Sequence, residues 1–158
     1  TTIVTSSSAI LCTNGFLKEL SPQLEVKPGR GQILMTEVID NLPIKGVFHC
    51  EQGYYYFRNV GNQILLGGGR NIDFEEEETT EIKLSDKIQD KLEELLFKTI
   101  LPKSSTKIVQ RWSGIMGFSS DKAIIAKRIS PNVAVGFGCN GMGVALGSLV
   151  AKKVAQLF

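Results

Sequence analysis

The stretch Asn132–Phe158 reads NVAVGFGCNGMGVALGSLVAKKVAQLF, and it combines three local signals. The β-branched run at 133–135 predicts a strand, glycines follow at 136, 138, 141 and 143, and a helix of small apolar residues comes next. Glycines permit positive φ and close approach of a ligand, and the first turn of a helix leaves amide donors unpaired. The stretch therefore predicts a site for an electron-rich group at a helix N-terminus. The alternative, which the residues alone leave open, is that the glycines only allow tight packing of the helix on a sheet.

Gly136, Gly138 and Gly141 also satisfy the GxGxxG pattern of dinucleotide-binding folds. Such a unit needs a second parallel strand after its helix, and an acidic residue about 20 positions further on to bind the ribose. The sequence up to Phe158 contains neither. We therefore expect this loop to meet a part of a cofactor other than the pyrophosphate.

The composition is typical of one globular domain, with 158 residues, 42% hydrophobic and 22% charged residues, and a net charge of +2. No basic run is interleaved with aromatic residues, so we expect no nucleic-acid partner. No apolar segment approaches the roughly 18 residues of a membrane span, and the N-terminus lacks the basic start of a signal peptide, so a cytoplasmic location is expected. Cys12, Cys50 and Cys139 are widely spaced and predict free thiols rather than a disulfide framework or a metal site.

Turn residues divide the chain into short strands and two main helices. We expect strands at 1–4, 9–12, 30–39, 47–50, 54–60, 63–67, 107–112, 123–129 and 133–135, with a connector at 22–28 and a turn-rich stretch at 113–120. The first two strands are expected to form a hairpin around the polar residues 5–8. Ser85–Leu101 is predicted to be a helix, capped by Ser85 and ended by Pro102. The final helix has little polar surface, so we expect it to be mostly buried.

Three further patterns can be interpreted either as sites or as ordinary structure. Thr13, Asn14 and Gly15 follow an apolar strand, where ligands bind in α/β sheets, although a plain turn is the alternative. Tyr54, Tyr56 and Arg58 share one face of a strand by alternation, and they either line a pocket or are half-buried cross-strand residues. The glutamate-rich run at 75–81 is predicted to be a solvated loop rather than a metal or acid–base cluster.

Few residues can carry acid–base chemistry. His49 is the only histidine, which argues against a multi-histidine metal site and a Ser-His-Asp triad. No pair of side chains stands out as acid and base, so the catalytic residues stay unknown. An enzyme built on this chain would need a cofactor to perform the reaction.

Five motifs in order resemble the carboxyl-terminal part of FAD-dependent oxidoreductases of the D-amino-acid oxidase and glycine oxidase superfamily. The motifs are AILCTNGF, VKPGRGQILMTE, GYYYFRNVGNQILLGGGR, RWSGIMGFSSD and GFGCNGMGVALG, and together they span nearly the whole chain. The resemblance implies an FAD cofactor whose ADP half is bound by an N-terminal segment with the true dinucleotide fingerprint. This chain has no counterpart of that segment. Since it also begins with Thr1 rather than Met, we expect a piece of a longer polypeptide whose N-terminal remainder is its partner, although a trimmed clone would look the same.

The resemblance also assigns site residues. It implies that Thr13, Asn14 and Gly15 pass near the cofactor, and that the loop and helix start at 140–144 face the isoalloxazine ring; these residues are Asn140, Gly141, Met142, Gly143 and Val144. Tyr54 matches the tyrosine that touches substrate in glycine oxidase-like members. Those members have arginines, which hold a substrate carboxylate, where this chain has Met116 and Cys139. Arg58 and Arg111 are the candidate substitutes.

These observations predict an α+β fold, with a largely antiparallel mixed sheet, two main helices and remnants of an FAD-binding domain at both ends. We expect residues 1–20 and 130–158 to belong to the FAD-binding domain and residues 21–129 to form a substrate-binding sheet with the helix at 85–101. The expected function is that of an FAD-dependent oxidoreductase fragment, whose parent takes a hydride from a carbon bearing an amine or hydroxyl. Its substrate would be a small amine, amino acid or hydroxy acid, and the isolated chain is not expected to retain FAD or activity. The alternative is a non-enzymatic ligand- or protein-binding module derived from the same fold.

Overall fold

A computed structural model describes residues 2–138 and 140–158 and confirms an α+β fold with a five-stranded, largely antiparallel sheet. The chain groups into two compact units, one of Thr1–Gly29 with Ile115–Phe158 and one of Arg30–Gly114. The chain passes between them within strand β2 (Val26–Thr36) and returns within strand β6 (Ile108–Ser119). The assignment of residues 1–20, 21–129 and 130–158 to domains stays a prediction.

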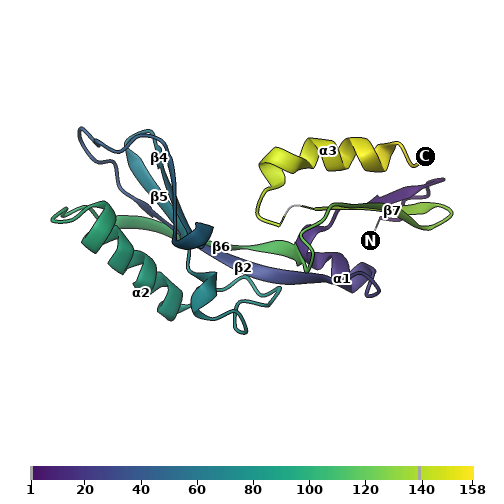
Figure 1. The fold of residues 1–158 in the computed structure, drawn as a ribbon, viewed down its shortest axis with the longest axis horizontal. Helices are drawn as coiled ribbons and strands as arrows, with labels where there is room; N and C mark the ends of the chain where they lie inside the picture. Colours follow the sequence, from purple (N-terminus) through teal and green to yellow (C-terminus); the bar gives the residue numbers. More distant parts are fainter. Residues whose placement is uncertain (1, 139) are drawn as a thin grey trace. The chain divides into compact units, whose positions relative to one another are not determined.

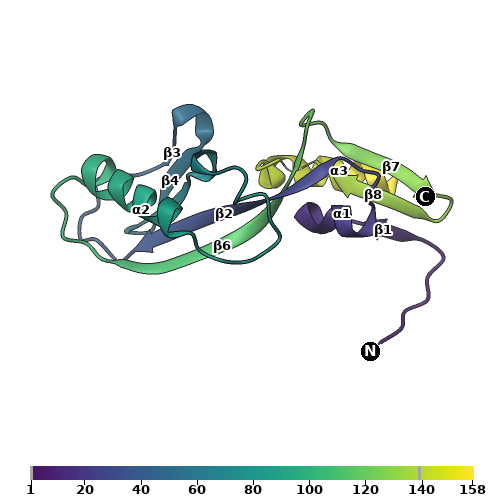
Figure 2. The ribbon, with the colours of Figure 1, turned by 90° about the horizontal axis from the view of Figure 1, so that it is seen from below.

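The first unit contains a three-stranded sheet in the order β1-β8-β7. Its strands are β1 (Ala9–Leu11), β7 (Ile125–Ser130) and β8 (Val133–Phe137), and its helices are η1 (Asn14–Phe16), α1 (Leu17–Leu20) and α3 (Gly143–Ala155). β1 pairs with β8 in parallel and β7 pairs with β8 antiparallel. α3 covers one face of this sheet (Figure 1 and Figure 2). A small core of apolar side chains in this unit is formed by Leu17, Leu24, Val26, Val135 and Phe137.

Two expectations about this unit are wrong. Residues 2–4 are not a strand, and β1 forms no hairpin with them, because its backbone partners lie on the buried strand β8 instead. The final helix is not mostly buried: only Val150 and Val154 are buried, while Leu149 is 42% exposed. The physical reason is that a helix in a two-layer arrangement covers its sheet with a single stripe of side chains.

The second unit is built on the sheet β3-β4-β5-β2-β6. It contains β3 (Val47–Cys50), η2 (Glu51–Gly53), β4 (Tyr55–Val60), β5 (Gln63–Gly68), η3 (Arg70–Ile72), α2 (Asp86–Leu95) and the π-helical turn η4 (Leu96–Ile100). α2 packs on the sheet through one apolar stripe, which includes Ile88 and Leu92 and continues to Leu96 of η4. The core joins Leu34, Tyr55, Ile64 and Leu66 of the sheet to Ile88, Leu92 and Leu96 of the helix.

The boundaries of two long strands differ from the expectation. β2 begins at Val26, inside the stretch predicted to be a connector, and β6 continues to Ser119 through the stretch predicted to be turns. Gly117 allows the second extension, since a Cβ there would lie 2.5 Å from the ring of Phe137. The glycine is therefore a packing feature of a strand rather than a turn signal.

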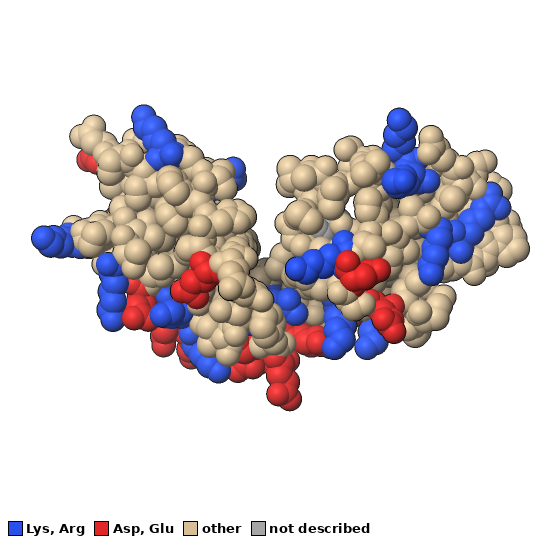
Figure 3. Space-filling model, viewed as in Figure 1, with Lys and Arg blue, Asp and Glu red and all other residues tan. Residues whose placement is uncertain are grey.

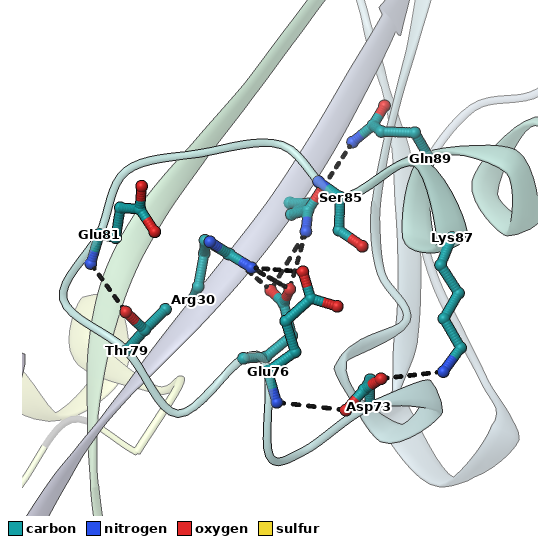
Figure 4. A network of polar contacts seen from close by, with 10 residues as sticks. Arg30, Asp73, Glu76, Thr79, Glu81, Ser85, Lys87 and Gln89 are labelled. Carbon is teal, nitrogen blue, oxygen red and sulfur yellow. Dashed lines mark hydrogen bonds and ion pairs between the residues drawn. The ribbon is translucent and has the colours of Figure 1, made fainter.

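The glutamate-rich run is not wholly solvated, which corrects a further expectation. Glu77 is fully buried and its carboxylate accepts hydrogen bonds from Arg30, at 2.6 Å from Nη2, and from Gln32, at 3.0 Å. Gln32 in turn accepts bonds from the backbone of Ser85 and the side chain of Gln89 at the start of α2. Figure 4 shows this network, which ties the loop between η3 and α2 to the sheet. Ser85 therefore contributes its backbone N–H, and its side chain does not cap the helix.

Candidate functional site

In the first unit, two turns leave the same edge of the sheet. Because β1 and β8 are parallel and Leu11 pairs with Val135, the turn at Thr13–Gly15 and the loop that leads to α3 both start from the carboxyl ends of their strands. Ligands bind at such edges in α/β sheets. We call residues 13–15 and 140–144 the turn edge.

Asn14 fixes the first turn to β6. Its side-chain amide donates to the carbonyl oxygen of Ile115 at 3.3 Å, and its side-chain oxygen accepts from the N–H of Gly117 at 3.0 Å. Asn14 adopts a φ of 50°, a conformation that asparagine tolerates better than most residues. Gly15 is required for packing, since a Cβ there would lie 2.6 Å from the carbonyl oxygen of Met116.

Asn140 fixes the second loop to the same strand. Its side-chain oxygen accepts from the N–H of Ser119 at 2.8 Å, and its side-chain amide donates to the hydroxyl of Ser119 at 3.3 Å. Asn140 also has a positive φ, of 42°. The structure thus brings both halves of the turn edge to one five-residue segment of β6, at 115–119.

The turn edge offers hydrogen-bond donors without partners in the described part of the chain. The first hydrogen bonds of α3 are those that the N–H groups of Ala145 and Leu146 donate to the carbonyl oxygen of Met142. The N–H groups of Gly143 and Val144 precede them and have no acceptor among residues 2–138 and 140–158. The hydroxyl of Thr13 is buried and likewise has no partner among the described residues. An electron-rich ligand can satisfy such donors at the positive end of a helix.

The loop itself is open. Gly141 has a φ of 84°, and nothing lies within 4 Å of the position that a Cβ would take. Met142 is 52% exposed, and Val144 is fully exposed. These residues are not sealed among packed side chains, so a flat group can approach them. Cys139, one of the two positions at which the resemblance leads one to expect an arginine, lies outside the described residues.

The predicted substrate residues are divided between the units. Met116 belongs to the first, and its carbonyl oxygen borders Gly15. Tyr54 and Tyr56 belong to the second, where Tyr54 is 40% exposed and the ring of Tyr56 covers Gly67. Burial raises the pKa of Tyr56. Arg58 is exposed on β4.

The two candidate substitutes for the missing arginines are not arranged as a carboxylate clamp. Arg111 donates to the side chains of Gln89, at 2.6 Å, and Glu93. Arg58 lies opposite Val47 and Leu65 in the sheet and is exposed. Sequence reasoning missed Phe74, whose ring meets that of Tyr54 edge-on at 5.9 Å, and Ser119. A lone aromatic residue before an acidic run was the available signal for Phe74.

Other classes of site receive no support from the described residues. No three His, Cys, Asp or Glu side chains among residues 2–138 and 140–158 are grouped so that they could hold a metal ion. On the face drawn in Figure 3, Lys and Arg side chains are scattered singly or in small groups, some beside Asp and Glu side chains and some apart from them, and they do not merge into one continuous basic patch. None of the helices in the described part of the chain has the length and apolar character that crossing a membrane requires.

Comparison with known proteins identifies one matching sequence family and several solved structures of similar fold. The sequence model described as "DAO: FAD dependent oxidoreductase" matches residues 1–157. A search among curated protein sequences gave no match.

Solved structures that are similar to the chain share its fold at low sequence identity. Iminodiacetate oxidase from Chelativorans sp. BNC1 aligns with a TM-score of 0.73 at 14% identity, over 96% of this chain and 42% of its own. L-proline dehydrogenase from P. horikoshii gives 0.75 at 17% identity, over 95% and 42%. Glycine oxidase from Geobacillus kaustophilus gives 0.72 at 19% identity, over 95% and 40%. The chain thus spans about two fifths of the length of these proteins.

Proposed function

The chain belongs to the FAD-dependent oxidoreductase family, and from this premise we propose that its parent protein takes a hydride from a carbon bearing an amine or hydroxyl. The substrate would be a small amine, amino acid or hydroxy acid. Structures of similar fold include a glycine oxidase, an iminodiacetate oxidase and a proline dehydrogenase, which supports this choice. The cofactor would be FAD, with its nucleotide half bound by the N-terminal remainder of the polypeptide.

The turn edge has the properties needed to contact the flavin end of the cofactor. The amides of Gly143 and Val144 would donate to an electron-rich edge of the ring, and the positive end of α3 would stabilise negative charge there. The observation that carries the proposal is this pair of amides, which have no acceptor among the described residues, beside Gly141, where no described atom lies within 4 Å of the position that a Cβ would take. When bound, the flavin would supply the hydride acceptor, at its N5 atom.

Asn14 and Asn140 would keep the two halves of the turn edge in position, since each is bonded through its side chain to β6. Thr13 would donate its hydroxyl to the cofactor. On the substrate side, we propose Tyr54, Tyr56, Arg58 and Met116 as contacts. Met116 can supply only apolar contact, so a substrate carboxylate would be bound elsewhere.

The function is tested with the full-length protein under anaerobic conditions. We expect it to purify with bound flavin, and we expect the flavin absorbance to bleach on addition of at least one compound from a panel of amines, amino acids and hydroxy acids. A protein that contains no flavin, or whose flavin no compound of these classes reduces, would instead favour the binding-module alternative.

The role of Thr13 is tested by Thr13→Val, which removes the hydroxyl at nearly constant shape, with Thr13→Ser as the matched control. We expect Thr13→Val to weaken flavin binding by about tenfold, the size of one hydrogen bond. Stability without cofactor should not fall, because the hydroxyl has no partner among the described residues. Equal flavin affinity of Thr13→Val and the wild type would contradict this contact.

A further inference from the structure

We propose that strand β3 is a docking surface for a second copy of the chain, and that two copies join their five-stranded sheets edge to edge through it. The two β3 strands would run antiparallel about a twofold axis perpendicular to the sheet. This inference goes beyond the proposed function and does not depend on it.

β3 (Val47–Cys50) lies at one edge of the sheet, with β4 on one side and no strand on the other side among the described residues. Figure 2 shows the two strands next to each other. An edge strand presents backbone N–H and C=O groups that a further strand can bind, and proteins usually protect such edges with charged residues, proline or a covering segment. β3 contains no Lys, Arg, Asp, Glu or Pro, and its residues 47–49 are all exposed. It is therefore an unprotected edge.

The other edge strands in the described part of the chain are less suited to pairing. β7 contains Lys127 and Arg128, and β6 contains Arg111, whose side chain donates to Gln89 of α2. Charged side chains on an edge discourage the approach of another strand. β1 has only three residues. These differences single out β3.

Apolar side chains on β3 favour burial against another protein surface. Val47 is 69% exposed and Phe48 is 39% exposed. The ring of Phe48 stacks on that of Phe57 of β4, with the ring centres 4.7 Å apart and the planes at 9°. Because Phe48 is already held by this contact, burying its outer side would cost little side-chain entropy.

The twofold symmetry restricts how two β3 strands can pair. An axis perpendicular to the sheet keeps each face on its own side, and opposite residues of an antiparallel pair have their side chains on the same face. Opposite residues must therefore be both even-numbered or both odd-numbered. A register centred on Phe48 meets this condition, since it places Phe48 opposite Phe48 of the second copy and Val47 opposite His49 of the second copy.

The charges at the two ends of β3 favour this register and a second copy as the partner. Lys45 lies just before the strand, Glu51 follows it directly, and both are exposed. In the register centred on Phe48, Lys45 of each copy falls opposite Glu51 of the other, so the contact is made twice. Moving the centre by one residue in either direction separates these opposite charges. The edge is thus complementary in charge to a copy of itself.

Sedimentation of the full-length protein tests the proposal, and we expect a dimer to form between about 1 and 100 μM. Lys45→Glu and Glu51→Lys each place like charges in both contacts, so each should weaken dimerisation about tenfold or more. An equimolar mixture of the two variants should recover nearly the wild-type affinity, because each contact of the mixed dimer joins a glutamate to a lysine. Lys83→Glu makes the same change of charge at an exposed residue of the same unit and should have no effect.

Cysteine cross-linking tests the register. In a Cys50→Ser background, Phe48→Cys places two thiols opposite each other across the axis, at a Cα separation of about 4.5–5.5 Å, which a disulfide can span. Mild oxidation should link two copies through residue 48. Ile82→Cys in the same background is the control, since Ile82 is 72% exposed in the same unit and should give no such link.

Three outcomes would overturn the inference: a full-length protein that stays monomeric over this range, a dimer that neither charge reversal weakens, or a mixture of the variants that recovers no affinity. Hydrogen exchange would then identify another occupant, because protected amides at 47–50 in a monomer would mean that the remainder of the polypeptide covers the edge. Circular dichroism checks that each variant folds. If a charge variant does not fold, the cross-link at residue 48 decides the inference.

Discussion

At the scale of single residues, the second unit depends on one buried ion pair. Arg30 is 2% exposed and Glu77 is fully buried, and besides the bonds between their side chains the N–H of Arg30 donates to the carbonyl of Glu77 at 2.8 Å. Gln32 donates to the same carboxylate. Removing two charges from water is costly, and only a geometry with such additional hydrogen bonds compensates for it. The pair therefore fixes the position of the loop more than it adds net stability.

We predict that Glu77→Ala lowers the free energy of unfolding by about 3–5 kcal/mol, because it leaves the Arg30 charge buried without its partner. The measurement is chemical denaturation of the cofactor-free protein. Glu76→Gln is the control, since Glu76 is 47% exposed and 3.6 Å from Arg30, and it should cost less than about 1 kcal/mol. The double variant Arg30→Met/Glu77→Leu should lose less than Glu77→Ala. Equal losses for Glu77→Ala and Glu76→Gln would contradict the role of the buried pair.

Tyr56 should make the stability depend on pH at the alkaline end. Burial raises its pKa in the folded protein above the ordinary value of about 10. The unfolded chain then loses the Tyr56 proton first, so this contribution to stability is fully present below about pH 10 and is lost as the pH rises through the folded pKa. Urea denaturation between pH 8 and 11 should show a shallower alkaline decline for Tyr56→Phe than for the wild type. Parallel curves for the two proteins would contradict the prediction.

At the scale of elements, local signals decided what the sequence could predict. The strands expected at 54–60 and 63–67 are confirmed as β4 and β5, which pair across residues 61 and 62, and α2 lies within the helix predicted at 85–101. The turn at Thr13–Gly15 and the loop before α3 were both identified as candidates, because each combines turn residues with the end of an apolar strand.

Non-local contacts explain the errors. The partner of β1 lies more than 120 residues away on β8, so a nearby hairpin was the natural but wrong expectation. Glu77 is buried only because Arg30 and Gln32 meet it from another strand. Gly117 lies within a strand, where the absence of a side chain leaves room for the ring of Phe137. Periodicity and turn chemistry contain none of this information.

The close approach of β5 to the Tyr54 segment yields a prediction about Gly68. We expect Gly68→Ala to lower the free energy of unfolding by at least about 3 kcal/mol, since it combines an unfavourable positive φ with a severe overlap. Gly114→Ala is the matched control, because its Cβ would meet nothing within 4 Å, and it should change stability by less than about 1 kcal/mol. Both values come from urea titration of the same protein. A mild effect at Gly68 would mean that the strands can separate there without cost.

At the scale of the whole molecule, the proposed cofactor contacts belong to two short turns. Thr13–Gly15 and Asn140–Val144 both lie at the carboxyl edge of one small sheet. In the proposed arrangement they contact only the flavin end of FAD, which is a long molecule. A few hydrogen bonds of about 1 kcal/mol each do not hold a flexible dinucleotide against the loss of its translational and rotational freedom.

We therefore predict that the 158-residue chain, purified alone, contains far less than one flavin per chain, whereas the full-length protein purifies with flavin near one per chain. The flavin content of both preparations, measured by absorbance after denaturation, tests this directly. Dialysis against excess FAD serves as the control, because it distinguishes weak binding from loss of cofactor during purification. A yellow isolated chain with flavin near one per chain would mean that the turn edge alone holds the cofactor, and the nucleotide half would then need no further polypeptide. A colourless chain that still shifts the flavin spectrum at high FAD concentration would fit the view that the edge recognises the ring and that affinity comes from elsewhere.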